Sequence, residues 1–179
     1  MRIVRAIEEV TPAQPFAVTI GAFDGVHRGH QFLIEQLREH AAQRGAQSLA
    51  ITFEPDPAEV VSPNPPPYLS SLVQKIELLG ALRLDELCVV HFDEHVKGLS
   101  SEAFMDSLRS RAHVVDLLVG HDFAMGHDRQ GTRAVLEAYA KAHGFDCSTA
   151  QALEMDGEPV SASRIRRLMA EGDVEGAKR

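Results

Sequence analysis

The stretch FAVTIGAFDGVHRGH (residues 16–30) is an apolar run that passes directly into a glycine-rich segment. Its first five residues are typical of a buried strand, and Gly21, Gly25 and Gly29 allow the backbone to bend sharply and approach a ligand closely. A helical pattern of apolar residues follows over 31–44. The stretch therefore predicts a strand, a tight turn and a helix N-terminus, an arrangement that directs backbone N–H groups at an anion.

The rest of the chain repeats this alternation of apolar runs and helical patterns. The patterns predict further strands at 48–53, 86–92, 114–119 and 147–153, and helices at 31–44, 72–84, 101–112, 132–143 and 163–170, with a short helix from Asp173. Apolar strands separated by helices are typical of a parallel sheet covered on both faces. We therefore expect a doubly wound α/β domain with five parallel strands and ligands bound at their carboxyl ends.

A proline-rich stretch between Pro55 and Pro67 interrupts the alternation. It holds six of the nine prolines of the chain. Proline fixes φ and lacks an N–H, so we expect a long loop here and neither a regular helix nor a central strand. A long loop in a compact domain is either functional or a surface connector, and the sequence leaves both readings open.

Composition and charge limit the classes of partner. The chain has 179 residues, a formal net charge of −8 and no apolar run of 18 residues, which argues against nucleic acid and membrane partners. The N-terminus MRIVRAIEEV lacks the apolar core of a signal peptide. Cys88 and Cys147 fit neither a zinc site nor a disulfide framework, so we expect a cytoplasmic protein. The sequence gives no oligomeric state.

Two histidines follow the glycine-rich bend. His27 and His30 are three residues apart at the predicted helix start, so their imidazoles project to the same side. Imidazoles and backbone amides that converge on one spot suit a phosphate whose charge grows during a reaction. A glycine-rich turn with incidental histidines is the alternative. Two His, three Gly and Asp24 within ten residues favour the phosphate site.

The segment His27-Arg28-Gly29-His30 resembles the HxGH signature of nucleotidylyltransferases. The surrounding GAFDGVHRGH is similar to the FAD synthetase module of bacterial bifunctional riboflavin kinase/FMN adenylyltransferases. Four further stretches agree in order and approximate spacing: 53–57 (FEPDP), 69–79 (LSSLVQKIELL), 119–127 (VGHDFAMGH) and 160–174 (VSASRIRRLMAEGDV). The resemblance runs from about Phe16 to Arg179 and implies a Rossmann-like fold of the nucleotidylyltransferase type.

This resemblance implies a reaction in which the phosphate of FMN attacks the α-phosphate of ATP, giving FAD and pyrophosphate with Mg²⁺. Such an in-line displacement depends on positioning and charge stabilisation. The implied catalytic residues are His27, His30 and Arg164. The implied ATP-binding residues are Gly21, Phe23, Gly25, Gly29, Ser163, Arg164 and Arg166. The implied flavin-binding residues are Phe53, Pro55, Asp122 and Met125, with Asp122 also a candidate metal ligand.

Several of these residues have structural alternatives. Phe53 at a strand end is equally typical of the core. Asp122 also suits a turn, and Ser163 a helix N-cap. The basic run Arg164-Ile165-Arg166-Arg167 fits a solvated helix face, although the family match favours phosphate binding. Asp24 is a candidate for a hydrogen bond within the turn itself.

The sequence departs from the family pattern at four positions. Ala22 stands where an Asn is usual, Asp56 where a His is frequent, Met125 where a Phe is common and Ala162 where a Ser is expected. Most of these lie where we expect the second substrate, so nucleotidyl transfer is better supported than flavin specificity. The alternatives are another small phosphorylated acceptor or a non-catalytic nucleotide or flavin binder. We expect one domain over 1–179, without the riboflavin kinase domain and its activity.

Overall fold

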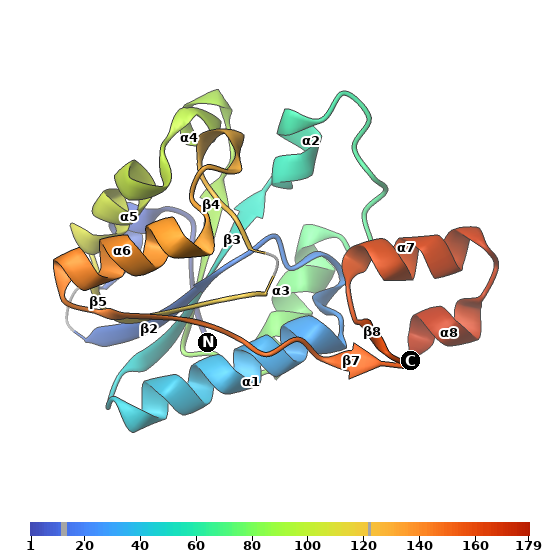
Figure 1. The fold of residues 1–179 in the computed structure, drawn as a ribbon, viewed down its shortest axis with the longest axis horizontal. Helices are drawn as coiled ribbons and strands as arrows, with labels where there is room; N and C mark the ends of the chain where they lie inside the picture. Colours follow the sequence, from blue (N-terminus) through green and yellow to red (C-terminus); the bar gives the residue numbers. More distant parts are fainter. Residues whose placement is uncertain (12–13, 122) are drawn as a thin grey trace.

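A parallel sheet forms the centre of the molecule. The computed structural model describes residues 1–11, 14–121 and 123–179. Within them the sheet has six strands in the order β1-β4-β3-β2-β5-β6 (Figure 1). Its strands are β1 (Arg2–Val4), β2 (Pro15–Ile20), β3 (Gln47–Glu54), β4 (Glu86–His91), β5 (His113–Val119) and β6 (Asp146–Thr149), and a separate antiparallel pair consists of β7 (Glu154–Met155) and β8 (Glu158–Pro159).

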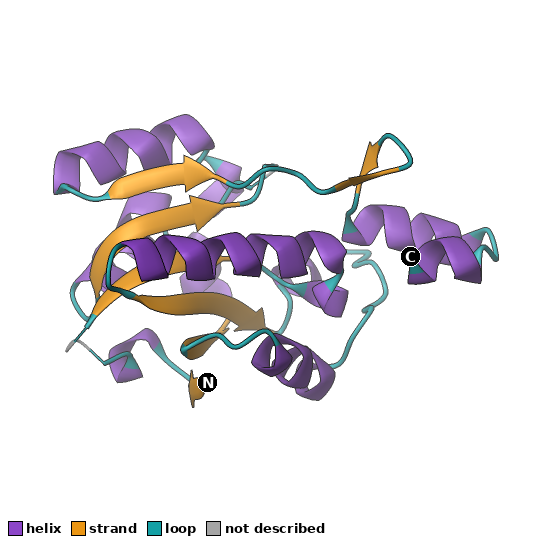
Figure 2. Ribbon diagram, turned by 90° about the horizontal axis from the view of Figure 1, so that it is seen from below, coloured by secondary structure: helices purple, strands orange, loops and turns teal. Residues whose placement is uncertain are grey.

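Helices cover both faces of the sheet. The α-helices are α1 (Arg28–Gln43), α2 (Pro57–Val61), α3 (Leu72–Ala81), α4 (Glu94–Gly98), α5 (Ser101–Arg109), α6 (Arg133–His143), α7 (Ala162–Ala170) and α8 (Val174–Lys178). The 3₁₀ turns are η1 (Ile7–Glu9), η2 (Asp24–Val26) and η3 (His127–Arg129). Figure 2 shows α7, α8 and the β7–β8 pair standing apart from the sheet, and we call this unit the C-terminal lobe. No helix in the described ranges is long and apolar enough to cross a bilayer.

The core has two layers because each central strand sends alternate side chains to opposite faces. On one face the strand residues pack with α5 and α6, and on the other with α1 and α3. The first layer includes Val18, Ile20, Leu49, Ile51, Leu117 and Val119, and the second includes Ala17, Ala50, Leu87, Val89 and Leu118. This two-sided burial explains the nearly continuous apolar runs and confirms the doubly wound α/β architecture.

The sixth strand corrects the expected count of five. β1 has three residues and pairs with the start of β4, in the register Arg2↔Glu86 and Val4↔Cys88. Only Val4 of the three is buried. The segment therefore has no apolar run that sequence periodicity could detect, and its strand conformation depends on pairing with a segment more than 80 residues away.

The proline-rich stretch contains a helical turn, α2, so the expectation of a loop without helix is wrong over 57–61. Pro57 occupies the first turn of α2, where a missing N–H removes no hydrogen bond. The side chain of Asp56 caps the helix by accepting from the backbone N–H of Ala58 at 2.9 Å. Proline is thus compatible with the start of this helix, although not with its interior.

The order in which strands are added to the sheet reverses at β2. β2 pairs with β3 on one side and with β5 on the other, and β4 and β6 extend the sheet outward from these neighbours. In doubly wound sheets such a reversal opens a crevice beyond the carboxyl ends of the two central strands. The glycine-rich turn after β2 and the loop after β5 both lie at this crevice.

Candidate active site

The glycine-rich turn after β2 has a left-handed backbone at three positions. Phe23 has φ 52°, Gly25 has φ 71° and Val26 has φ 40°. A Cβ atom at Gly25 would lie 2.9 Å from the Cβ of Leu69, which is closer than van der Waals contact allows. Glycine is therefore required at position 25 both for its backbone conformation and for the close approach of the neighbouring segment.

The two histidines form a stacked pair at the start of α1. The ring centroids of His27 and His30 are 3.6 Å apart, with 19° between the ring planes. His27 is the N-cap of α1, and its Nδ1 accepts a hydrogen bond from the backbone N–H of His30 at 3.3 Å. Since an accepting Nδ1 carries no proton, neutral His27 carries its proton on Nε2. The predicted convergence of the two imidazoles is confirmed.

The inner ring of the pair, His30, is held in an apolar setting. The ring of Phe23 packs against it edge-on, with centroids 5.1 Å apart. Burial lowers the pKa of His30 well below its ordinary value of 6.5, and a positive charge on the neighbouring His27 or Lys75 lowers it further. His30 is therefore neutral near pH 7. Its Nδ1 is buried and has no hydrogen-bond partner among the described residues.

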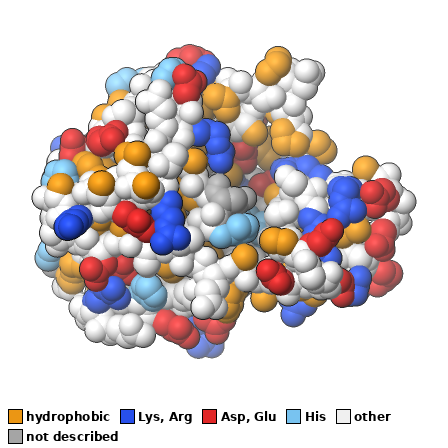
Figure 3. Space-filling model, viewed as in Figure 1, with side chains coloured by type: hydrophobic (Ala, Val, Ile, Leu, Met, Phe, Trp, Pro, Cys, Tyr) orange, Lys and Arg blue, Asp and Glu red, His pale blue; other side chains and the backbone are white. Residues whose placement is uncertain are grey.

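A cavity of about 870 Å³ lies at the crevice and reaches His30. Its walls come from the ends of β2, β3 and β4, from α2 and α4, and from the loop after β5. The lining residues include Gly21, Ala22, Phe23, His30, Phe53, Asp56, Phe92, Lys97 and Met125. Figure 3 shows a hollow beside the C-terminal lobe, but none of the described lining residues of this cavity belongs to that lobe. The volume suits a ligand of nucleotide size.

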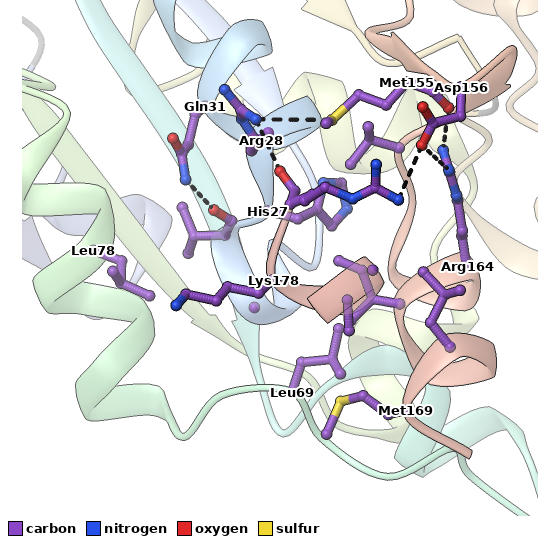
Figure 4. A pocket seen from close by; sticks show the side chains of 18 residues that line it. His27, Arg28, Gln31, Leu69, Leu78, Met155, Asp156, Arg164, Met169 and Lys178 are labelled. Carbon is purple, nitrogen blue, oxygen red and sulfur yellow. Dashed lines mark hydrogen bonds and ion pairs between the residues drawn. The ribbon is translucent and has the colours of Figure 1, made fainter. Parts of the chain in front are cut away.

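A second, smaller pocket of about 320 Å³ lies on the other side of the histidine pair. It is enclosed by the start of α1, by α3 and by the C-terminal lobe. Figure 4 shows His27, Arg28 and Arg164 around it, together with the apolar side chains of Leu69 and Met169. Because His27 lines this pocket and His30 lines the larger cavity, the stacked pair is a wall shared by both.

The residues predicted for the site are divided between these two spaces. Gly21, Phe23, His30, Phe53 and Met125 line the larger cavity, and Gly25, His27 and Arg164 line the smaller pocket. Gly29, Pro55, Ser163 and Arg166 are not among the described lining residues of either space. Asp122 lies outside the described residues, so its flavin and metal assignments stay predictions.

Residues 10–164 match the FAD synthetase family. The chain belongs to this family. The bifunctional riboflavin kinase/FMN adenylyltransferase of Pseudomonas fluorescens is 35% identical over 181 residues, and the alignment covers 100% of this chain and 58% of that relative. The chain thus spans less than two thirds of that relative's length.

Solved structures confirm the fold of the chain. A Streptococcus pneumoniae structure described as a macrolide-efflux protein superposes with a TM-score of 0.84 at 21% identity, covering 98% of this chain and 57% of that chain. The pantoate-β-alanine ligase of Francisella tularensis, solved with β,γ-ATP and β-alanine, superposes with a TM-score of 0.61 at 14% identity, covering 95% and 79%. At these identities the similarity concerns the fold alone.

The basic residues of the last FAD synthetase motif make contacts that sequence reasoning missed. The guanidinium of Arg164 donates to the carbonyls of Met155 at 2.6 Å and Glu158 at 2.9 Å, and it lies near the carboxylates of Asp156 and Glu158. Arg164 therefore holds the β7–β8 hairpin to α7 while it lines the smaller pocket. Sequence reasoning missed this hairpin, although Asp156-Gly157 between its two-residue strands is a typical hairpin turn sequence with positive φ at both residues.

The N-cap of α7 is Ser161 and not Ser163. Ser161 has an extended backbone, and its Oγ accepts from the backbone N–H of Arg164 at 3.2 Å. Ser163 lies inside the first turn of the helix. The helix begins one residue earlier than expected, at Ala162, which moves the capping position with it.

Phe53 is a core residue that also borders the larger cavity, and its flavin-binding role stays a prediction. Its side chain is buried and packs edge-on against Phe92, with centroids 5.4 Å apart, and against Phe104 at 6.2 Å. The same ring borders the larger cavity. A core residue at the carboxyl end of a strand thus also forms an aromatic wall of the candidate site.

The described side chains contain no group of three or more His, Cys, Asp and Glu residues that could hold a metal ion. Mg²⁺ commonly keeps several waters and binds through substrate phosphates and one or two carboxylates. The donor set therefore fits a magnesium ion that arrives with the nucleotide better than a resident ion in a protein cage.

Proposed function

We propose that this chain transfers AMP from ATP to FMN and releases pyrophosphate, forming FAD. One observation carries the proposal: in a chain of the FAD synthetase family, two imidazoles stack at the wall between two pockets of ligand size. Two reacting phosphates that met at this wall would lie beside hydrogen-bond donors from both rings.

The proposed reaction is a single in-line displacement. A phosphate oxygen of FMN forms a bond to the α-phosphorus of ATP, the bond from that phosphorus to the bridging oxygen breaks, and pyrophosphate leaves with its electron pair. Charge grows on the oxygens around the α-phosphorus. His27 would donate through Nε2–H, and neutral His30 would donate from the cavity side. No covalent enzyme intermediate is required.

The lining of the two spaces supports a division between the substrates. The larger cavity has an aromatic wall of Phe53 and Phe92 and the thioether of Met125, which suit a flat ring system. The smaller pocket has the cations Arg28, Arg164 and Lys178, which suit the phosphates of ATP. ATP would enter as its magnesium complex, because the described residues fit an ion bound to the nucleotide.

The direct test is incubation of the purified chain with ATP, Mg²⁺ and FMN, with FAD measured by chromatography and pyrophosphate measured enzymatically. Equal amounts of both products are expected. Substrate binding without either product would overturn the proposal and favour a non-catalytic nucleotide or flavin binder.

A different phosphorylated acceptor is the second candidate, and one observation favours it. Ala22, Asp56 and Met125, three of the four departures from the family pattern, all line the larger cavity. The acceptor end of the site has therefore changed, whereas both histidines are retained. Pyrophosphate release with another small phosphate ester, and none with FMN, would establish this alternative.

A further inference from the structure

The carboxylate of Asp24 joins three segments that are far apart in the sequence. Its side chain is only 4% exposed. Both of its oxygens accept from the backbone N–H of Leu69 at 3.0 Å, and Oδ1 also accepts from the backbone N–H of Ser70 at 3.0 Å and from its hydroxyl at 3.3 Å. Oδ2 pairs with the guanidinium of Arg166 at 2.5 Å. The expected hydrogen bond within the turn is replaced by contacts to two other segments.

The partners of Asp24 are also bonded to one another and to the turn. The hydroxyl of Ser70 accepts from the backbone N–H of Gly25 at 2.9 Å, and Nε of Arg166 donates to the carbonyl of Pro67 at 2.8 Å. The guanidinium of Arg166 thus spans from the 67–70 segment to the glycine-rich turn, and α7 is attached through it. Arg166 is 21% exposed, so this ion pair is largely removed from solvent.

These contacts hold a backbone conformation that does not form easily. Three of the four residues from Phe23 to Val26 have positive φ, and one of them is β-branched. Positive φ is strained for the non-glycine residues Phe23 and Val26, and it persists only where surrounding contacts determine it. The next residue after this turn is His27, the N-cap that stacks on His30.

We infer that Asp24 is a positioning residue, which places the His27–His30 pair by tying its turn to the 67–70 segment and, through Arg166, to the C-terminal lobe. The inference rests on the proposed function, because it assigns the pair a role in nucleotidyl transfer. Asp24 acts through the two imidazoles and does not touch substrate. Arg166 accordingly helps to hold the site together through Asp24 and Pro67, whereas the family resemblance implied that it binds ATP.

The competing role for an acidic residue near ATP is a ligand to magnesium. Each oxygen of Asp24 already accepts from at least two donors, and one of these donors is a cation. An arginine and a divalent cation would compete for the same carboxylate. The experiment below separates the two roles.

The test compares Asp24→Asn with a matched control, Asp85→Asn. Asp85 also accepts from a backbone N–H and a hydroxyl, both of Ser48, at 2.8 and 2.7 Å, and it lies at the opposite, amino end of the sheet. Asp24→Asn should lower kcat about tenfold or more, a loss typical of a displaced catalytic group, with KM for ATP and FMN changed by less than about threefold. Asp85→Asn should lower thermal stability and leave kcat within about twofold.

Three kinetic results would overturn the inference. One is an unchanged kcat in Asp24→Asn, and another is an equal fall in kcat in the control. The third is recovery of the Asp24→Asn rate at high Mg²⁺ concentration, which would indicate a metal ligand. If Asp24→Asn does not fold, Arg166→Lys serves instead: it keeps the charge but loses the planar fork that reaches both Asp24 and Pro67, so a smaller fall in kcat is expected.

A measurement without substrate separates this inference from the proposed function. In the wild-type chain, ¹⁵N NMR of the His27 ring should show an unprotonated Nδ1 and a protonated Nε2. In Asp24→Asn the ring should show a mixture of tautomers, whereas an unchanged His27 spectrum would overturn the positioning role. Absence of FAD formation by the wild-type chain would instead defeat the proposed function and leave this readout intact.

Discussion

His27 caps the helix that carries His30, and the two rings lie face to face. The Nδ1 of His27 accepts from the backbone N–H of His30, and the ring centroids are 3.6 Å apart. His27 thus has a structural task on Nδ1 and, when neutral, carries its proton on Nε2. The pair is therefore oriented by the helix backbone before any substrate binds, which is the condition for stabilising charge without reorganisation.

Replacing His30 with alanine should lower kcat by about a hundredfold, a typical loss for one charge-stabilising donor. ATP affinity should fall much less, because the backbone amides of the turn remain. Steady-state kinetics with ATP and FMN would measure both. His113→Ala, an exposed histidine at the amino end of β5, should leave kcat unaltered. A His30→Ala enzyme with normal kcat would remove His30 from the mechanism.

Stability should fall as the solution is acidified below pH 6.5, partly because of His30. Burial lowers the folded-state pKa of His30 below 6.5, so in that range the unfolded chain binds a proton that the folded chain does not. Protonation therefore favours the unfolded state. Urea unfolding at pH 7.5 and 5.5 should show a smaller loss of stability in His30→Gln than in the wild-type chain. Identical losses in the two chains would contradict the assignment.

Gly25→Ala should be more destabilising than Gly45→Ala. Both glycines have positive φ, 71° and 60°, so alanine is strained at either position. Only the Cβ at position 25 meets a neighbour, the Leu69 Cβ at 2.9 Å, whereas nothing lies within 4 Å at position 45. Overpacking typically adds about 1–3 kcal/mol. Denaturant unfolding of the two variants measures the difference, and equal effects would mean that Leu69 moves aside without cost.

Arg164→Ala should destabilise the hairpin region by about 1–3 kcal/mol, since it removes charge-assisted bonds to two carbonyls from a side chain that is 16% exposed. We also expect ATP binding to weaken more than FMN binding. Arg167→Ala is the matched control, because Arg167 also pairs with Glu158 but is 51% exposed and should contribute little. Thermal unfolding and calorimetric titration of both variants measure the two effects. Equal losses of ATP and FMN affinity would contradict the placement of Arg164.

Asp56→Asn should strengthen FMN binding several-fold at low salt. Asp56 lines the larger cavity, where its negative charge opposes a phosphorylated ligand. Asparagine is an equally good N-cap, so α2 should retain its cap and stability should change little. Titration calorimetry at low and high ionic strength should show a gain that diminishes with salt. Unaltered affinity at low salt would place the FMN phosphate far from Asp56.

Much of the fold was predictable because it depends on local patterns. Buried strands such as 48–53 appear as apolar runs. The helix predicted over 31–44 has apolar residues at helical spacing, namely Phe32, Leu33, Leu37 and Ala41. β1 was not predictable, because it has three residues and pairs with a distant segment. The two-residue strands β7 and β8 were missed although Asp156-Gly157 between them is a typical hairpin turn sequence. α2 was missed for a different reason: proline is unfavourable inside a helix but acceptable at its start.

The site was predictable where the residues that carry the chemistry lie close together in one segment of the sequence. His27 and His30 are three residues apart on one helix start, and helix geometry alone brings them together. Asp24 and Arg166 are 142 residues apart in the sequence, and no local pattern predicts that they pair. Lys75 in α3 belongs to the 69–79 motif, but the sequence does not indicate that it is buried, with only 1% of the residue exposed. Burial lowers the pKa of Lys75, and its charge lowers the pKa of His30. Tertiary contacts of this kind require the folded structure.

The C-terminal lobe lacks an anchor in the hydrophobic interior. Neither α7 nor α8 contains a buried residue, and the Asp24–Arg166 pair and the Arg28 bond to the Arg179 carbonyl connect the lobe to the body. Detachment of the lobe would leave both layers of the central sheet intact. Its amides should therefore exchange with solvent through local opening, at a lower free energy than global unfolding. Arg164, the cation proposed to bind ATP, thus belongs to a part of the molecule that we expect to open locally.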